Sequence, residues 1–209
     1  YIHSATLLHD DVIDRSEKRR GLKTANIIWS NKYSVLVGDF LFSRAFQLMV
    51  RTGSLRIMKT LSDASAVISQ GEILQVGIEN KLDASKEDYL KVIKGKTSAL
   101  FSAACQAGAE ITEASDPHIE KIRDYGEYIG TSFQLIDDLL DYSGNENTMG
   151  KKTGNDFFEK KITLPIIHAY KKSTKAEKKL IKDIFQKPIP SNDDLNDFLN
   201  ILENKKSLL

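Results

Sequence analysis

Apolar residues recur along most of this chain at the three- and four-residue spacing of amphipathic helices. Only four prolines interrupt the pattern, and no stretch of useful length alternates apolar and polar residues as a strand would. The predicted helices cover residues 1–14, 31–49, 55–78, 85–109, 116–142 and 162–170. The sequence therefore predicts an all-α fold of many helices.

Polar segments separate these helices. Residues 15–31 are basic and contain Gly21, so we expect a loop that could cover a site. Residues 143–156 are rich in Gly, Asn and Lys, which predicts another loop. Ser85, followed closely by two acids, is typical of a capped helix start, and Asp116 before a proline indicates the same.

Composition and charge narrow the class of protein. With 209 residues, 41% of them hydrophobic, we expect residues 1–209 to form a single domain with a buried core. Thirty basic and 29 acidic residues leave a net charge of +1, which does not favour a nucleic-acid partner. Because Cys105 is the only cysteine, an internal disulfide is excluded and a cytoplasmic, reducing location is expected.

The ends of the chain lead to a further expectation. No apolar run reaches the roughly 20 residues that a transmembrane helix needs, and we expect no signal peptide. The chain opens at Tyr1 inside an apolar pattern, without an initiator methionine. We therefore expect a fragment that lacks N-terminal helices and is incomplete at its C-terminus.

The spacing Asp-Asp-x-x-Asp occurs twice inside apolar helical segments. Its members are Asp10, Asp11 and Asp14, then Asp137, Asp138 and Asp141. On a helix this spacing places three carboxylates on one face. They repel one another unless a cation bridges them, and oxygen ligands favour Mg²⁺ or Ca²⁺ over Zn²⁺. Two facing motifs would hold a diphosphate through bridging metals, whereas two solvated helix faces are the alternative.

Basic residues with neighbouring glycines supply the complement to these acids. They are Arg19, Arg20, Lys96 (followed by Thr97), Lys151, Lys152, Lys160 and Lys161. Each is a candidate phosphate ligand, although such side chains are as often simply solvated. Gly126 and Gly130 share the face of the second motif. Their position indicates either room for an elongated ligand or close packing of another helix.

In these motifs the chain resembles the all-trans polyprenyl diphosphate synthases, which elongate isoprenoid chains head to tail. The matching segments are Asp10-Asp11-x-x-Asp14-x₄-Arg19-Arg20-Gly21, Gly38-Asp39, Gly71-Glu72, Gly95-Lys96-Thr97, Phe133-Gln134-x-x-Asp137-Asp138-x-x-Asp141, Gly150-Lys151, Gly154-Asn155-Asp156 and Lys161-x-Thr163-Leu164-Pro165. They occur in the family's order from Leu7 to about Pro165. The family's N-terminal Gly-Lys-x-x-Arg segment has no counterpart, and Lys152 and Lys160 replace a common Pro and Gly.

The resemblance implies a multi-helix bundle around a central cavity with two facing aspartate-rich motifs. It also implies a Mg²⁺-dependent reaction in which isopentenyl diphosphate attacks the cation of an allylic diphosphate such as farnesyl diphosphate, with three Mg²⁺ ions bound beside the substrate. The six aspartates would be metal ligands, with Asp11, Asp138 and Asp141 supporting or binding through water.

The remaining roles are also implied by the resemblance. Arg19, Lys96 and Lys161 would hold the allylic diphosphate, Arg20 would hold isopentenyl diphosphate, and Lys151 would add to substrate binding. Thr97 and Gln134 would present dipoles to the cation.

Product length follows from the turn before the first motif. In the resembled family, bulky residues four or five positions before that motif stop elongation early. Here these positions hold Thr6 and Ala5, both small, which implies a product of about C35–C50, best matched by octaprenyl diphosphate for a quinone such as ubiquinone. Helical geometry places Thr6 in line with Asp10, whereas Ala5 points elsewhere, so its role rests on the resemblance alone.

Several alternatives stay open at this point. A short-chain synthase making geranylgeranyl or farnesyl diphosphate shares these motifs, and a terpene cyclase shares the first of them. A non-catalytic partner subunit of a heteromeric synthase would usually have lost aspartates, and none of the six is lost. A helical Ca²⁺-binding protein is the least specific alternative. The resemblance favours a homodimeric enzyme.

Overall fold

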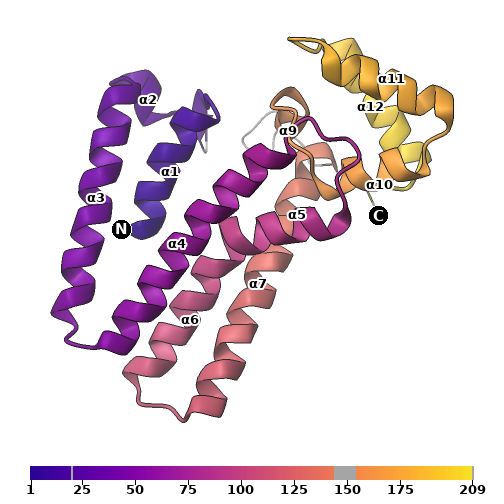
Figure 1. The fold of residues 1–209 in the computed structure, drawn as a ribbon. Coiled ribbons are helices and arrows are strands. Elements are labelled where there is room, and N and C mark those ends of the chain that lie inside the picture. The colour runs from indigo at the N-terminus through magenta and orange to yellow at the C-terminus, as the bar shows by residue number, and fades with distance from the viewer. Residues whose placement is uncertain (20, 144–153, 209) are drawn as a thin grey trace. The chain divides into compact units, whose positions relative to one another are not determined.

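The computed structural model describes residues 1–19, 21–143 and 154–208. It divides into two compact units, Tyr1–Ile68 with Ala99–Glu127 and Ser69–Ser98 with Tyr128–Leu209. The first contains α1 (Ile2–Ile13), β1 (Lys18–Arg19), β2 (Leu22–Lys23), α2 (Ala25–Ile28), α3 (Asn31–Arg51) and α6 (Ala99–Ile111) (Figure 1). The second contains α5 (Lys86–Ile93), η1 (Lys94–Ser98), α9 (Asn155–Phe158), α10 (Leu164–Lys172), α11 (Lys175–Gln186) and α12 (Asn192–Asn204). Residues of α4 (Leu55–Ile78) and α7 (Asp116–Ser143) belong to both units. The all-α prediction is confirmed.

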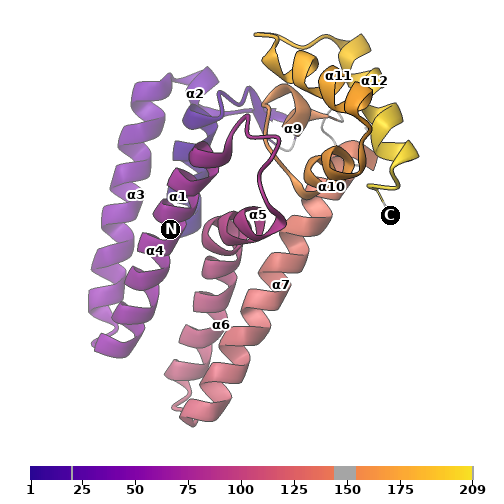
Figure 2. The same cartoon turned by 45° about the vertical axis from the view of Figure 1, so that its right-hand side comes forward.

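In the first unit, α1 packs against α3, and both views show the two helices side by side (Figures 1 and 2). The Ser34 hydroxyl donates to the Leu8 carbonyl at 2.9 Å. His9 Nε2 lies 3.2 Å from the Val35 carbonyl, and its ring lies where a side chain on Gly38 would be. The glycine therefore lets α3 approach α1, and His9 joins the two helices.

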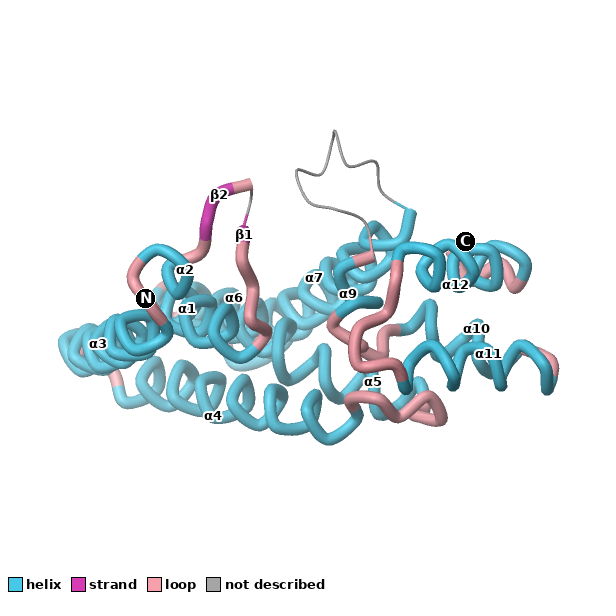
Figure 3. Tube along the Cα trace, turned by 90° about the horizontal axis from the view of Figure 1, so that it is seen from above, coloured by secondary structure: helices cyan, strands magenta, loops and turns pink. Residues whose placement is uncertain are grey.

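A small hairpin follows α1, where the sequence predicts only a loop. The two-residue strands β1 and β2 pair antiparallel, with Lys18 opposite Lys23, and α2 follows them (Figure 3). Strands this short have no sequence alternation to detect, so the prediction of a loop over residues 15–31 is wrong in this detail. Asn26 holds the segment to α1, because its Nδ2 donates to the carbonyls of Asp11 and Ser16, both at 3.2 Å.

The helix α6 packs closely against the first part of α7. A Cβ built on Gly126 would lie 2.7 Å from the Phe101 carbonyl oxygen and 2.9 Å from Ser102 Cα. Both views show these helices running alongside each other (Figures 1 and 2). Of the two interpretations of Gly126 that the sequence allows, close helix packing is the one observed.

The second unit is built on an aromatic core. The Phe157 ring stacks on Phe198, with 5.3 Å between ring centroids, and Phe185 and Tyr142 meet Phe198 edge-on. Phe157 and Phe198 are fully buried, so this cluster supplies much of the apolar area that holds α7, α9, α11 and α12 together. Figure 2 shows α10, α11 and α12 grouped on one side of the unit.

The start of α5 and the segment that follows it place part of the predicted site. The Ser85 hydroxyl accepts a hydrogen bond from the Asp88 amide, and the Asp88 carboxylate accepts one from the Ser85 amide, which confirms the predicted cap. After Ile93 the chain forms one π-helical turn, η1, before α6 begins. Such turns are frequent at functional sites.

Among the described residues, no helix is both long and apolar enough to cross a membrane.

The helix contact at Gly126 makes a prediction about stability. We expect Gly126→Ala to lower the free energy of unfolding by about 1–3 kcal/mol, because the new methyl group meets backbone atoms of α6. The matched control is Gly108→Ala within α6, where a Cβ would meet no atom within 4 Å. The control should raise the free energy of unfolding by about 0.5–1 kcal/mol. Urea unfolding measures both, and equal stability of the two variants would contradict the packing described.

Candidate functional site

The first acidic motif lies at the C-terminal end of α1. Asp10 and Asp11 are in its last turn and Asp14 is its C-cap. The Asp11 side chain is buried, and its Oδ1 accepts hydrogen bonds from Arg19 Nε at 3.0 Å and Nη2 at 2.8 Å. The hairpin therefore returns Arg19 to the motif it follows in sequence. In this arrangement Arg19 has a carboxylate partner, and Asp11 is compensated.

The position of these carboxylates is electrostatically unfavourable. The C-terminus of a helix carries partial negative charge, which destabilises acids there, and α1 has no basic residue in its last turn. Asp14 is half-buried and has no ion pair or side-chain hydrogen bond with any described residue. The Asp14 carboxylate is therefore an oxygen donor that a cation could pair with.

The second motif lies near the C-terminal end of α7, which ends at Ser143 and has no basic residue in its last turn. Asp138 is buried, and its Oδ2 accepts a hydrogen bond from the Tyr89 hydroxyl at 2.6 Å. Its Oδ1 accepts from Gln134 Nε2 at 2.7 Å. Burial and the neighbouring Asp156 carboxylate raise the pKa of Asp138 to about 6, although these two donors oppose the rise.

Asp141 anchors the segment that follows the second motif. Its Oδ2 accepts a hydrogen bond from the Asp156 amide at 3.0 Å, and its carbonyl accepts from the Gly154 amide at 2.7 Å. Lys161 Nζ lies 3.3 Å from Asp156 Oδ1 and 3.8 Å from Glu159 Oε2. Asp141 therefore holds the backbone that presents Asp156, and Asp156 in turn holds Lys161.

The π-helical turn η1 presents Lys96 and Thr97. Lys96 Nζ pairs with Glu72 Oε2 of α4 at 2.9 Å, and the Thr97 hydroxyl donates to Gln134 Oε1 at 2.7 Å. Gly71 allows the approach of α4, because a Cβ there would meet the backbone of Gly95 and Lys96. The predicted residues Thr97 and Gln134 are thus in direct contact, and Lys96 forms an ion pair with the Glu72 carboxylate.

The structure assigns the predicted residues to the two units. The first unit holds Ala5, Thr6, Asp10, Asp11, Asp14 and Arg19; the second holds Lys96, Thr97, Gln134, Asp137, Asp138, Asp141 and Lys161. Arg20 and Lys151 lie outside the described residues. Among the described residues, no group of three or more His, Cys, Asp or Glu side chains could hold a metal ion by itself. A Mg²⁺ ion with one or two carboxylates, completed by water and phosphate oxygens, fits that finding.

Two participants escaped the sequence analysis. Tyr89 bonds Asp138 from 49 positions away, and Glu72 pairs with Lys96 from 24 positions away. Gly71-Glu72 is one of the segments that resemble the family, but that resemblance predicts no role for the Glu72 side chain. Tyr89 stands on the buried face of α5 with Val92 and Ile93, so in the sequence it is indistinguishable from a core aromatic.

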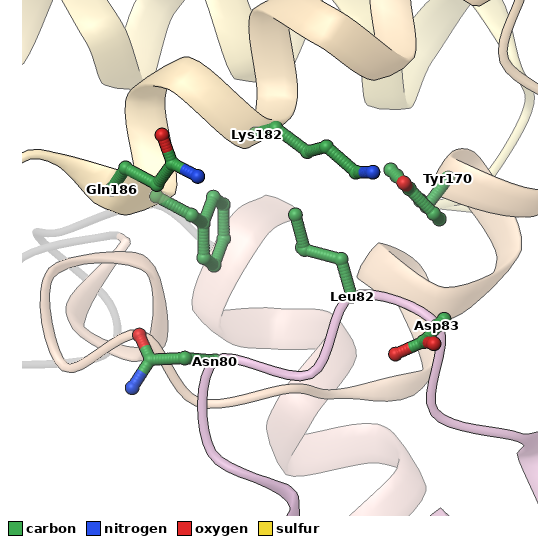
Figure 4. A pocket seen from close by; sticks show the side chains of 7 residues that line it. Asn80, Leu82, Asp83, Tyr170, Lys182 and Gln186 are labelled. Carbon is green, nitrogen blue, oxygen red and sulfur yellow. The ribbon is translucent and has the colours of Figure 1, made fainter.

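A pocket in the second unit lies outside the predicted set. Its volume is about 280 Å³ and its wall is formed by the α4–α5 connection together with α10 and α11 (Figure 4). The lining residues are Asn80, Leu82, Asp83, Tyr170, Lys182, Phe185 and Gln186. None of the aspartates, lysines or arginines predicted to bind substrate or metal lines this pocket.

Comparisons with known proteins identify the relatives of the chain. The family model described as "Polyprenyl synthetase" matches residues 1–202. The octaprenyl diphosphate synthase of Escherichia coli (strain K12) is 46% identical over 182 residues, which are 87% of this chain and 56% of that protein. The chain therefore spans a little over half of this relative's length.

Solved structures agree with the sequence comparison. A decaprenyl diphosphate synthase from Rhodobacter capsulatus is 47% identical with a TM-score of 0.93, covering 99% of this chain and 64% of that one. A polyprenyl synthase from Caulobacter crescentus CB15, complexed with calcium and isoprenyl diphosphate, is 43% identical with a TM-score of 0.94, covering 99% of this chain and 63% of that one.

The environment of Asp138 predicts a pH dependence of stability in the metal-free protein. Because the pKa of Asp138 rises from 3.8 to about 6 on folding, the folded state binds more protons between these values than the unfolded state. The contribution is therefore favourable below about pH 4 and is lost as the pH rises through 6, on the order of 3 kcal/mol. Urea unfolding in the presence of a chelator measures it, and Asp138→Asn should flatten this part of the profile. An identical profile in both proteins would contradict the assignment.

Proposed function

Because the chain belongs to the polyprenyl synthetase family, we propose that the whole protein condenses isopentenyl diphosphate head to tail with an allylic diphosphate as an all-trans prenyltransferase. The observation that carries this proposal is the position of two Asp-Asp-x-x-Asp motifs at the C-terminal ends of α1 and α7. Neither helix has a basic residue in its last turn, so acids near these ends gain stability from a bound cation, which suits a reaction that starts with a metal-bound diphosphate.

The contacts suggest how the six aspartates divide their work. Asp11, Asp138 and Asp141 already accept hydrogen bonds from Arg19, from Tyr89 and Gln134, and from the Asp156 amide, so we assign them supporting roles. Membership of the family, and not a lack of contacts, makes Asp10, Asp14 and Asp137 the proposed ligands of Mg²⁺, three ions being expected with substrate. When bound, Mg²⁺ neutralises the departing diphosphate and so favours cleavage of the allylic C–O bond.

The basic residues would hold the diphosphate by exchanging partners. Arg19, Lys96 and Lys161 each lie beside a carboxylate that keeps the cation in place before substrate binds. A diphosphate offers more oxygens and more charge than one carboxylate, so it can share or replace that partner. Arg20 and Lys151, which lie outside the described residues, are proposed to bind isopentenyl diphosphate and to add to substrate binding, respectively.

The pair Thr97 and Gln134 would stabilise the allylic cation. The Thr97 hydroxyl donates to Gln134 Oε1, so the lone pairs of both oxygens are left to interact with positive charge. Preorganised dipoles of this kind lower the barrier because they need no reorientation during the reaction. The double bond of isopentenyl diphosphate then forms the new C–C bond, and the released diphosphate accepts the proton that is lost.

A long product is the more specific part of the proposal. Thr6 and Ala5 precede the first motif, and the relatives described above make octaprenyl and decaprenyl diphosphates by name. We therefore propose a product of about C35–C50, best matched by octaprenyl diphosphate for a quinone side chain such as that of ubiquinone. Ala5 is fully buried in α1, whereas Thr6 is only partly buried and donates to the His3 carbonyl at 2.9 Å. Thr6 is accordingly the better placed of the two to limit chain growth.

Assembly and location stay predictions. The exposed face of α3 carries Tyr33, Leu36, Val37 and Phe40, which recur at helical spacing and have exposed fractions of 42–66%. Such a face suits burial against a second copy of the chain, in line with the expected homodimer. The cytoplasmic location rests on the single cysteine of the sequence.

The activity itself is the first prediction. The purified protein, expressed at the full length of its gene, should extend farnesyl diphosphate with labelled isopentenyl diphosphate when Mg²⁺ is present and not when it is chelated. Asp14→Asn and Asp137→Asn should each lower kcat/KM by about 100-fold or more. Asp63→Asn, a change at an exposed surface aspartate of α4, is the control and should keep full activity. Absence of any extended product from the wild-type protein would refute the proposal.

Product length is the second prediction for this reaction. Thr6→Tyr should shorten the product by several isoprene units, because a ring would project from α1 one turn below Asp10. Thr6→Val, which removes the hydroxyl but keeps the size, should leave product length unchanged. Ala5→Phe is expected to lower thermal stability because the ring must enter a fully buried position. Chromatography of the products decides the matter, and a Thr6→Tyr protein with unchanged products would exclude Thr6 as a length determinant.

A further inference from the structure

A buried tyrosine outside both aspartate motifs contacts the second of them. Tyr89 lies on α5 and Asp138 on α7, and their side chains meet where both residues are almost fully buried, at 2% and 4% exposure. Resting on the proposed function, we propose that Tyr89 is a positioning residue, which sets the orientation of Gln134 and Thr97 through the Asp138 carboxylate.

The contact belongs to a chain of three hydrogen bonds. Tyr89 OH donates to Asp138 Oδ2 at 2.6 Å, Gln134 Nε2 donates to Asp138 Oδ1 at 2.7 Å, and Thr97 Oγ1 donates to Gln134 Oε1 at 2.7 Å. The four side chains come from α5, η1 and α7. Each of these three elements therefore contributes to one continuous polar network inside the second unit.

The direction of every bond follows from the carboxylate. An ionised Asp138 can only accept, so the amide of Gln134 must turn its NH₂ group toward it. The Gln134 oxygen then faces Thr97, whose hydrogen it accepts. Reversing the amide would set oxygen against oxygen at Asp138, which is repulsive. The network thus leaves oxygen lone pairs of Thr97 and Gln134 available for a cation, which is the orientation that the reaction needs.

Tyr89 is the outer anchor of this network. Packing alone does not require its hydroxyl, because phenylalanine would fill the same position among Val92 and Ile93. Burying a hydroxyl is costly unless it is hydrogen-bonded, and here its partner is an acidic-motif residue. Without the hydroxyl, Asp138 Oδ2 would lose its donor and the carboxylate could rotate. The orientation of the Gln134 amide would then no longer be fixed by its hydrogen bond to Asp138.

Kinetics of Tyr89→Phe in the protein at its full natural length test this role. We expect kcat to fall by about 10- to 100-fold, which is typical when a partner that orients a functional side chain is removed. The KM for isopentenyl diphosphate should stay within about 2-fold, and the melting temperature should be little changed, because the ring is retained. Tyr170→Phe is the matched control. The Tyr170 hydroxyl makes no hydrogen bond with the described residues, so this variant should keep wild-type kcat.

A double-mutant cycle separates positioning from general weakening of the fold. If Tyr89 acts through Asp138, adding Tyr89→Phe to Asp138→Asn should change kcat by less than about 2-fold. If the two effects multiply, Tyr89 acts by another route and the inference is overturned. Wild-type kcat in the single variant Tyr89→Phe would overturn it as well.

Binding of Mg²⁺ with inorganic diphosphate, measured by calorimetry, distinguishes failure of the proposed function from failure of the proposed role of Tyr89. Should the wild-type protein bind both but form no prenyl product, the proposed function fails. When the wild-type protein forms product, Tyr89→Phe should bind Mg²⁺ with inorganic diphosphate within about 2-fold of wild type, because Tyr89 acts on the orientation of Gln134 and Thr97. Binding weakened about 10-fold or more in Tyr89→Phe, but not in Tyr170→Phe, would show that Tyr89 acts on diphosphate binding instead and would overturn the inference. A wild-type protein that neither reacts nor binds would refute the function and the inference together.

Discussion

The constraint on which the rest of the structure depends is the placement of carboxylates at helix C-termini. Asp14 caps α1, and Asp141 lies in the last turn of α7, where the helix dipole opposes negative charge. A fold selected for stability alone would put lysine or arginine in these turns. Asp14 has no side-chain partner among the described residues, whereas Asp141 is relieved in part by the Asp156 amide. A cation bound beside either carboxylate would offset the unfavourable helix dipole.

The neighbouring structure limits this cost without removing it. Arg19 returns from the hairpin to Asp11, while Asp138 receives only the neutral donors Tyr89 and Gln134. A guanidinium supplies an opposite charge, whereas Tyr89 and Gln134 supply only dipoles, and burial together with the Asp156 carboxylate still raises the pKa of Asp138. The two motifs share a sequence pattern but differ in electrostatics. In the first motif Asp11 pairs with Arg19, and in the second Asp138 accepts hydrogen bonds from two neutral side chains.

Much of the fold was predictable from the sequence, and the exceptions have physical reasons. The long helices follow from apolar spacing, and the cap at Ser85 follows from local chemistry between residues three positions apart. The hairpin contains two residue pairs, too few for any periodic pattern. The π-helical turn η1 depends on where α4 packs, since Gly71 meets its backbone, and nothing within residues 94–98 encodes that contact.

The site was predictable in its components and not in their partners. Helical spacing places three carboxylates on one face, so the acidic motifs can be identified from the sequence alone. The bond between Tyr89 and Asp138 joins residues 49 positions apart, and it exists only because α5 and α7 pack in one particular register. Residues that touch substrate are constrained by chemistry and leave recurrent motifs, whereas residues that orient them are constrained by packing and resemble core. A side chain such as Tyr89 is therefore identified by asking which buried hydroxyl bonds a motif residue, a question that only the folded chain can answer.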